Sequence, residues 1–279
     1  MIASLNDRSP ERLRYASTHW SRDEDVRKAL DQYLRLGDKV YNRTKLRLFT
    51  ELVGDLRGRR ILDYGGGAGI TAIPYAKAGA DVLIVDAESN ALRTAEFYAK
   101  REGVLDHVFT LHSETLPPSL RREQFDVILA KDVVEHIEDD EQFLRDLSQL
   151  QQPGGRLILS TQNRRSLNYL IESTYQRRWC GNKQWMGWDK THVRFYTPAD
   201  LRRKLERVGY TVHRWAGVML VPYNIVSWLS LLRFSVELPA LHRLDLLLGR
   251  SFPFNRMGWN VIVSATRIRE SARRESACE

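Results

Sequence analysis

The sequence predicts an α/β fold: a Rossmann-like, seven-stranded, mostly parallel sheet with helices on both faces and additional helical lid elements. Two observations carry this prediction. Short apolar runs typical of buried strands alternate with longer segments whose apolar residues recur every three or four positions. The first such run, Arg59–Tyr64, leads directly into the glycine-rich loop Gly65–Gly69, which allows a tight turn from a strand into a helix.

Each element has its own local signal. Residues 22–57 are polar with apolar positions at mixed spacings of three and four, which predicts a helix. The run 153–155 marks a turn into a strand, while Thr197 as N-cap and Pro198 predict a helix that ends at Gly209. In chain order, the expected strands are 59–64, 81–86, 107–111, 125–130, 156–161, 210–216 and 259–266, and the other expected helices are 70–78, 89–102 and 138–150.

The last two expected strands have no ordinary crossover between them, because they flank an apolar block. We therefore expect one layered domain with two inserts. Its parts are an N-terminal helical cap at 1–57, a cofactor-binding core at 58–216 with an insert near 163–195, an apolar helical insert at 217–258, a final core strand at 259–266 and a basic flexible tail at 267–279.

Composition excludes some classes of protein and leaves others open. With 43% hydrophobic residues the chain can fill a core, and its two cysteines, Cys180 and Cys278, exclude a disulfide-rich secreted scaffold. Charged side chains stand where a signal peptide needs an apolar run, so we expect a cytoplasmic protein, with peripheral membrane contact as an alternative. The net charge of +8 favours an anionic partner, but it does not distinguish nucleic acid, a lipid surface and an acidic ligand.

The glycine-rich loop indicates a cofactor site. Residues 61–69 read hydrophobic-hydrophobic-Asp-x-Gly-x-Gly-x-Gly, whereas a dinucleotide fingerprint fits the loop only weakly. Asp63 would repel a pyrophosphate but suits the sulfonium and ammonium groups of S-adenosylmethionine. Asp86 ends the next expected strand, where a carboxylate can accept hydrogen bonds from both ribose hydroxyls.

With these motifs the chain resembles the class I S-adenosylmethionine-dependent methyltransferases over residues 45–216. The first motif matches 61–69 and the second 82–86, and the run 112–117 falls where the family usually contacts adenine. There the usual acid is replaced by His112 or shifted to Glu114. The cofactor contacts that the resemblance implies are Asp63, Gly65, Gly67, Asp86, Ala87, Ser113, Glu114, Lys131 and Asp132.

The mouth of the fourth expected strand carries a possible cation or proton site. Asp132, Glu135 and His136 stand at i, i+3 and i+4, and on a helical turn they share one face. Such a set can hold a divalent cation or form a base with its orienting acid, or else simply start a helix. The run also resembles the E-x-x-E-H segment that is associated with a divalent metal in the O-methyltransferases of ubiquinone biosynthesis, which implies Mg²⁺ or another divalent cation.

The first insert combines aromatic and cationic side chains, which suits an acceptor substrate, a nucleic-acid base or ordinary lid packing. We expect Trp185, Trp188, Arg194 and Tyr196 to contact the substrate. In an extended segment His192 shares a face with Arg194 and Tyr196, and its pKa near neutrality makes it the expected general base, with His136 as the second catalytic candidate.

The second insert is expected to form two amphipathic helices. Ile225, Trp228, Leu229 and Leu232 recur at helical spacing, as do Leu241, Leu244, Leu247 and Leu248. Helices in 217–250 could roof the active site, form a homodimer face or lie on a membrane. The uncharged run 215–232 contains proline, asparagine and serine, so a spanning helix is not expected.

The sequence therefore predicts a methyltransferase that uses S-adenosylmethionine and acts on a small-molecule acceptor, with oxygen as the favoured atom. The acceptor is expected to be aromatic, prenylated or acidic. Two alternatives remain: an NAD(P)-dependent oxidoreductase on the same sheet, and a non-catalytic methyltransferase-like module that binds RNA. DNA is not expected as a partner, because the mouth at 131–134 lacks the motif of enzymes that methylate nucleobase amines.

Overall fold

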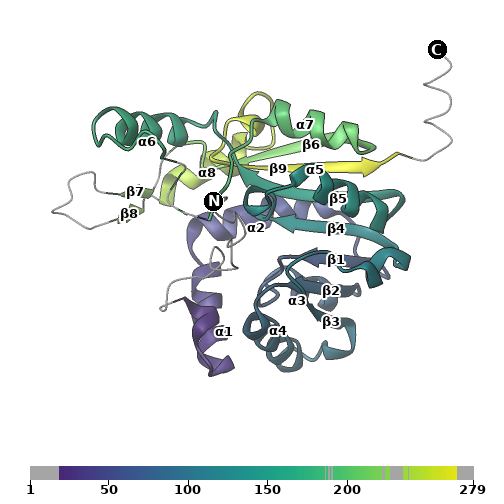
Figure 1. The fold of residues 1–279 in the computed structure, drawn as a ribbon. Helices are drawn as coiled ribbons and strands as arrows, with labels where there is room; N and C mark the ends of the chain where they lie inside the picture. Colours follow the sequence, from purple (N-terminus) through teal and green to yellow (C-terminus); the bar gives the residue numbers. More distant parts are fainter. Residues whose placement is uncertain are drawn as a thin grey trace, which may run out of the picture.

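The computed structural model of the chain describes residues 19–268 apart from 186, 188, 190, 222, 223, 227–234 and 238. One sheet has the strand order β3-β2-β1-β4-β5-β9-β6, which confirms the expected seven-stranded fold (Figure 1). Its strands are β1 Arg60–Tyr64, β2 Asp81–Asp86, β3 Val108–His112, β4 Phe125–Lys131, β5 Gln151–Gln162, β6 Tyr210–Val218 and β9 Asn260–Arg267. The chain order reverses between β1 and β4, and in such sheets ligands bind at the carboxyl ends of the strands on either side of this point.

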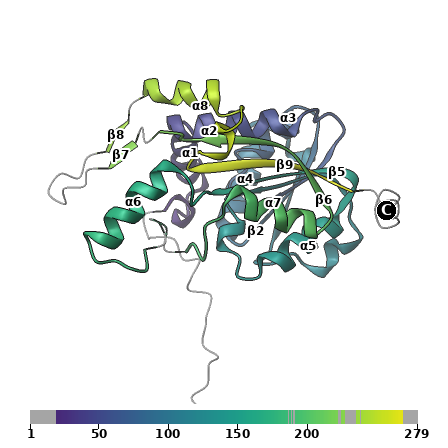
Figure 2. The same ribbon diagram turned by 90° about the horizontal axis from the view of Figure 1, so that it is seen from above.

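Helices cover both faces of the sheet (Figure 2). Apolar side chains of α2, α3 and α4 form one cluster with the sheet, and those of α5 and α7 form another on the opposite face. The helices are α1 Val26–Gly37, α2 Val40–Val53, α3 Ala72–Lys77, α4 Ser89–Arg101, α5 Asp140–Leu150, α6 Leu167–Arg178, α7 Pro198–Arg207 and α8 His242–Leu248. Single 3₁₀ turns lie at Trp20–Arg22, Leu105–His107, Pro118–Arg122, Val134–His136, Pro239–Leu241 and Phe254–Arg256.

Strand β9 runs antiparallel to both of its neighbours, β5 and β6. Between β6 and β9, helix α8 packs beside α2, and the chain re-enters the sheet at the carboxyl end of β6, where Val218 pairs with Asn260. A return of this kind produces an antiparallel strand, because a parallel strand would need a crossover back along the sheet.

The segment 22–57, expected to be helical, forms two helices, α1 and α2. They are separated at Asp38 and Lys39, and the preceding Gly37 lies so close to Ile70 that a Cβ there would approach its Cδ1 to 2.3 Å. Glycine and aspartate are weak helix formers, so the break falls at the locally weakest point. The division into a cap at 1–57 and a core stays a prediction, although α2 packs directly on the sheet.

Of the two amphipathic helices expected in the second insert, the first is contradicted at Ile225 and the second is present as the short α8. Asn224–Val226 forms strand β7 and pairs antiparallel with strand β8, Ser235–Glu237, so Ile225 is in a strand. Isoleucine and valine favour strands, which outweighs the helical spacing. The residues 228, 229 and 232, which the expected first helix needs, lie outside the described part, and the second expected helix is the short α8. Among the described residues, no helix is both long and apolar enough to span a membrane.

We expect α2 to be part of the cooperative core. Phe49 is 0% exposed between α2 and the sheet. Phe49→Ala should therefore lower the free energy of unfolding by about 3–5 kcal/mol in a denaturant titration. Leu247→Ala, at a side chain that is 71% exposed, is the control and should change it by less than about 0.5 kcal/mol. Equal effects of the two substitutions would contradict the packing of α2.

Candidate active site

The loop between β1 and α3 depends on glycine for two reasons. Gly65 and Gly67 have φ angles of 71° and 56°, in the left-handed region that other residues rarely adopt. A Cβ on Gly65 would lie 2.6 Å from Cγ2 of Val133, which follows β4. The loop thus passes so close to the residues that follow β4 that a side chain at Gly65 would not fit.

Asp63 lies at the end of β1 and is 1% exposed. The hydroxyl of Thr71 donates a hydrogen bond to Oδ2, whereas Oδ1 is buried with no hydrogen-bond partner in the described structure. Burial raises the pKa of Asp63 to about 6. A buried acceptor without a partner is costly, so this position favours a ligand that brings a cationic donor such as an ammonium group.

Asp86 ends β2 next to this loop. Its Oδ2 accepts a hydrogen bond from the backbone N–H of Gly67 at 2.8 Å, and its Oδ1 accepts one from Glu88 at 2.9 Å. The carboxylate therefore holds the glycine-rich loop against the end of β2. Its expected contact with ribose hydroxyls stays a prediction.

The residues expected at the adenine end meet at the neighbouring strand ends. His112 Nε2 donates to the carbonyl of Ala87 at 2.9 Å, and the Tyr64 hydroxyl donates to the carbonyl of Glu114 at 3.1 Å. The backbone N–H of Ser113 donates to the last carbonyl of β2 at 3.0 Å. The structure thus gathers the cofactor residues predicted at the ends of β1, β2 and β3 on one edge of the sheet.

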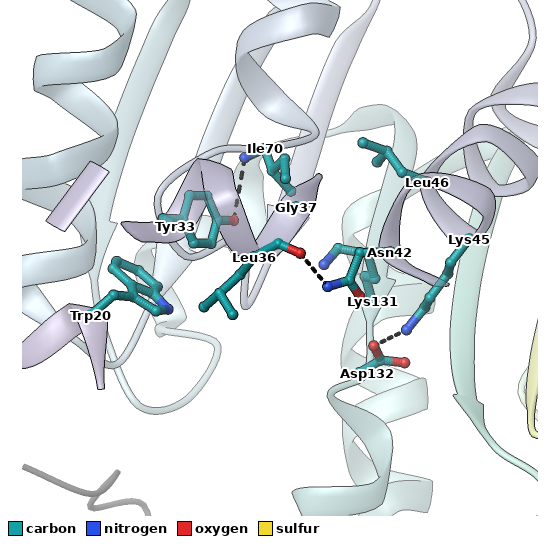
Figure 3. A pocket seen from close by; sticks show the side chains of 10 residues that line it. All are labelled: Trp20, Tyr33, Leu36, Gly37, Asn42, Lys45, Leu46, Ile70, Lys131 and Asp132. Carbon is teal, nitrogen blue, oxygen red and sulfur yellow. Dashed lines mark hydrogen bonds and ion pairs between the residues drawn. The ribbon is translucent and has the colours of Figure 1, made fainter. Parts of the chain in front are cut away.

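A cavity of about 130 Å³ opens between the N-terminal helices, the glycine loop and β4 (Figure 3). Its lining comprises Trp20, Tyr33, Leu36, Gly37, Asn42, Lys45, Leu46, Ile70, Lys131 and Asp132. The rings of Trp20 and Tyr33 pack with centroids 4.5 Å apart, and the Tyr33 hydroxyl accepts a hydrogen bond from the backbone of Ile70 at 3.4 Å. The N-terminal segment therefore covers the glycine loop.

Lys45 is a site residue that sequence reasoning missed. It lies on α2 with its side chain 6% exposed, and in Figure 3 it points toward the mouth of β4. A signal existed, because Lys45 stands in line with Leu48, Phe49 and Leu52 at helical spacing. A lysine within the apolar stripe of a helix indicates a buried charge that needs a partner, either within the protein or in a ligand.

Lys45 forms an ion pair with Asp132, which also accepts hydrogen bonds from Ser160 Oγ at 3.0 Å and Asn260 Nδ2 at 2.8 Å. Desolvation lowers the pKa of Lys45. Desolvation alone would raise the pKa of Asp132, but the charges of Lys45 and Lys131 hold it well below its ordinary value. Asp132 is therefore an ionised acid with several partners, in a left-handed conformation with φ of 57°.

Asp132, Glu135 and His136 are expected to share one face of a helical turn. In the structure this turn is only a 3₁₀ turn that spans Val134–His136 and leaves Asp132 outside it. Glu135 and His136 lie on it, and their third neighbour is His192 from the first insert. One ligand atom from each of these three residues lies within 4.8 Å of the others, and this group does not include Asp132. The structure thus brings together both expected catalytic histidines, with ring centroids 4.8 Å apart, and leaves Asp132 with Lys45.

The expected substrate residues make structural contacts of their own. Trp185 is buried and packs on Tyr169 with centroids 5.7 Å apart, and position 188 lies outside the described residues. Arg194 forms an ion pair with Asp140 at 2.6 Å, and the Tyr196 hydroxyl donates to the same carboxylate at 2.6 Å. Arg194 and Tyr196 thus anchor the insert on α5. Their role in acceptor binding stays a prediction that this network does not support.

An open α/β sheet with a glycine loop, and with acids ending two adjacent strands, defines a domain that binds a nucleoside-containing cofactor. Residues 32–214 match a protein family described as methyltransferase domain. The ubiquinone biosynthesis O-methyltransferase of Nitrobacter winogradskyi is 34% identical over 175 residues, which are 61% of this chain and 63% of that protein. The enzyme of the same name from Azorhizobium caulinodans is 33% identical over 196 residues, which are 67% of this chain and 74% of that protein.

Solved structures share the fold. A magnesium protoporphyrin IX methyltransferase from Synechocystis, with bound S-adenosylhomocysteine, has a TM-score of 0.55 at 18% identity and covers 85% of this chain and 93% of that one. An S-adenosylmethionine-dependent methyltransferase from Mesorhizobium loti has a TM-score of 0.53 at 18% identity and covers 80% and 98%. The chain belongs to the methyltransferase-domain family. The resemblance stated from the sequence is confirmed, and the oxidoreductase alternative is not supported.

The buried carboxylate of Asp63 predicts how cofactor affinity depends on pH. With a pKa of about 6, Asp63 becomes neutral in acid and loses its attraction for an ammonium group. Affinity for S-adenosylhomocysteine, measured by calorimetry, should fall by about tenfold between about pH 7 and pH 5. Asp63→Asn should bind about tenfold more weakly at neutral pH and show almost no change over the same range.

The control is Asp106→Asn, at an exposed acid outside the site, which should retain the fall in affinity. A pH-dependent fall that persists in Asp63→Asn would assign the titration to another group.

Proposed function

We propose that the protein transfers the methyl group of S-adenosylmethionine to a hydroxyl oxygen of a small-molecule acceptor. The observation that carries this proposal is the pair of opposite charges beside the glycine loop, Asp63 and Lys45. The amino-acid end of the cofactor has one ammonium and one carboxylate. A dinucleotide offers no such pair.

The cofactor fits the residues at the strand ends. The unpartnered Oδ1 of Asp63 suits the ammonium group, and Lys45 can exchange Asp132 for the cofactor carboxylate. Asp86 can accept hydrogen bonds from the ribose hydroxyls, and Ala87 and Ser113, which follow β2 and β3, are the proposed contacts of the adenine. This arrangement would direct the sulfonium toward the mouth of β4.

Methyl transfer then requires little more than alignment. A lone pair of the acceptor oxygen forms the new bond to the methyl carbon while the carbon–sulfur bond breaks, and the sulfonium becomes a neutral thioether. The hydroxyl proton must leave. Glu135, His136 and His192 form a group beside the mouth of β4, and a side chain of this group can accept that proton. The protein holds the reactants in line and excludes water.

The acceptor class follows from the relatives and from the apolar inserts. Both cited relatives are named as O-methyltransferases of ubiquinone biosynthesis, which favours an aromatic hydroxyl on a lipophilic molecule. On α6, Leu167 and Leu170 are 46% and 53% exposed, and near α8 the exposed fractions of Leu247 and Phe252 are 71% and 73%. These side chains support a lipophilic acceptor. Peripheral membrane contact or a homodimer through 217–250 is part of the same proposal.

Cofactor selectivity tests the role of Lys45. The wild type should bind S-adenosylhomocysteine much more tightly than 5′-methylthioadenosine, which lacks the carboxylate. Lys45→Met should weaken S-adenosylhomocysteine binding by at least about tenfold and leave 5′-methylthioadenosine within about threefold. Lys28→Met, at an exposed lysine of α1, is the matched control. Equal losses for both ligands would indicate a purely structural lysine.

Turnover tests the acceptor atom. With methyl-labelled cofactor, a prenylated catechol should accept the label on oxygen, and the matched aniline should not. His136→Ala should lower kcat by about a hundredfold or more with little change in KM for the cofactor, and His213→Ala, at an exposed histidine of β6, should not. Transfer to nitrogen would overturn the oxygen assignment. Salt-sensitive RNA binding without any turnover would favour the RNA-binding alternative.

A further inference from the structure

We propose that Glu135, His136 and His192 bind a divalent transition-metal ion, and that His192 from the first insert replaces Asp132 as the third ligand. The role of this ion in the reaction rests on the proposed function. Its binding does not, and can be measured separately.

The three side chains come from two segments that are fastened together. The backbone N–H of Val193 donates to the carbonyl of Glu135 at 2.9 Å, and the hydroxyl of Thr191 lies 2.9 Å from His136 Nδ1. These contacts hold the insert against the turn after β4. One ligand atom of each residue then lies within 4.8 Å of the others, which small rotations can reduce to a coordination geometry.

Hydrogen bonding assigns the free nitrogen of His136. Thr191 Oγ1 lies 2.6 Å from Asp189 Oδ1 and donates its single proton to that carboxylate. It therefore accepts from His136, so Nδ1 of His136 carries the proton and Nε2 keeps its lone pair. A metal-bound histidine characteristically has its other nitrogen hydrogen-bonded in this way.

Two further atoms lack partners where a cation would supply one. Glu135 is 0% exposed, and its Oε1 has no hydrogen-bond partner in the described structure, while its Oε2 accepts from Thr161 at 2.9 Å. His192 Nδ1 is buried and likewise unpartnered in that part of the chain, and its Nε2 faces Asp189 at 3.8 Å. A buried carboxylate oxygen without a partner is costly, and a bound cation would relieve that cost.

Asp132 is excluded from this set by its own contacts. Its carboxylate is engaged by Lys45, Ser160 and Asn260. A cation there would compete with a buried ammonium group a hydrogen bond away. The sequence spacing thus suggests Asp132 as a metal ligand, but in the folded chain its carboxylate pairs with Lys45 instead.

The donor set selects the metal. Two imidazoles and one carboxylate suit Zn²⁺, Fe²⁺, Co²⁺ or Mn²⁺, whereas Mg²⁺ prefers oxygen ligands and retains its waters. Three protein ligands leave a coordination position open. An ion bound there would lower the pKa of a coordinated acceptor hydroxyl, so that its proton could pass to water. The two histidines and Glu135 would then act as ligands, in place of accepting the proton themselves.

Cobalt(II) titration of the chelator-treated, tag-free full chain tests the site. We expect visible d–d bands that saturate at one equivalent, with calorimetry giving the affinity. His192→Ala and the isosteric Glu135→Gln should each weaken Co²⁺ binding by at least about tenfold, and zinc should displace cobalt while millimolar Mg²⁺ does not.

Matched variants separate this site from the rest of the chain. His213→Ala and Cys180→Ser should bind Co²⁺ with unchanged affinity, since both side chains are exposed and lie outside the proposed ligand set. Asp132→Asn removes a nearby charge but no ligand, so it should weaken Co²⁺ binding much less than His192→Ala does. The other variants must retain S-adenosylhomocysteine binding, which shows that they are folded. Asp132→Asn is exempt, because Asp132 is paired with Lys45, the proposed partner of the cofactor carboxylate. Unchanged cobalt affinity in both His192→Ala and Glu135→Gln, or its loss in Asp132→Asn alone, would overturn the ligand set. If the wild type does not bind S-adenosylhomocysteine at all, the proposed function is overturned and the metal site is not.

Discussion

The carboxylate of Asp132 joins four elements at the mouth of the sheet. It follows β4, pairs with Lys45 of α2, and accepts hydrogen bonds from Ser160 of β5 and Asn260 of β9. Removing one partner of such an ion pair costs far more than the pair contributes, because the other charge stays buried without compensation. Lys45, with 6% of its side chain exposed, is that other charge. This contact therefore ties α2 to the mouth of β4, and both side chains line the cavity beside it.

The same residue directs the chain into the rest of the site. Its left-handed φ of 57° turns the backbone away from the strand direction and into the 3₁₀ turn that carries Glu135 and His136. The first insert closes on that turn through Thr191 and Val193. The cofactor side therefore belongs to the sheet, whereas the acceptor side is completed by an insert. This agrees with the general rule that specificity in such folds lies in the segments added to the scaffold.

Local patterns predicted the sheet well because buried strands and tight glycine turns have strong local signals. They failed where two signals competed. The helical pattern over 22–57 continues past Gly37, whereas the structure divides the segment into α1 and α2 at Asp38 and Lys39, next to a glycine against which Ile70 packs. In the second insert, Ile225 fits a helical spacing and a strand equally well, and pairing with the segment around Val236 decided for the strand.

For the site, the sequence by itself determined the parts that lie within one turn of a strand end. Asp63, Gly65, Gly67 and Asp86 are close in space because each stands at the carboxyl end of a strand or in the loop that follows it. Contacts between distant segments could not be read in this way. That Lys45 reaches the mouth of β4, and that the third partner of Glu135 and His136 comes from the first insert, was decided by tertiary packing. Spacing along the chain describes which side chains share one element, and only the packing of elements decides which charges and lone pairs meet across them.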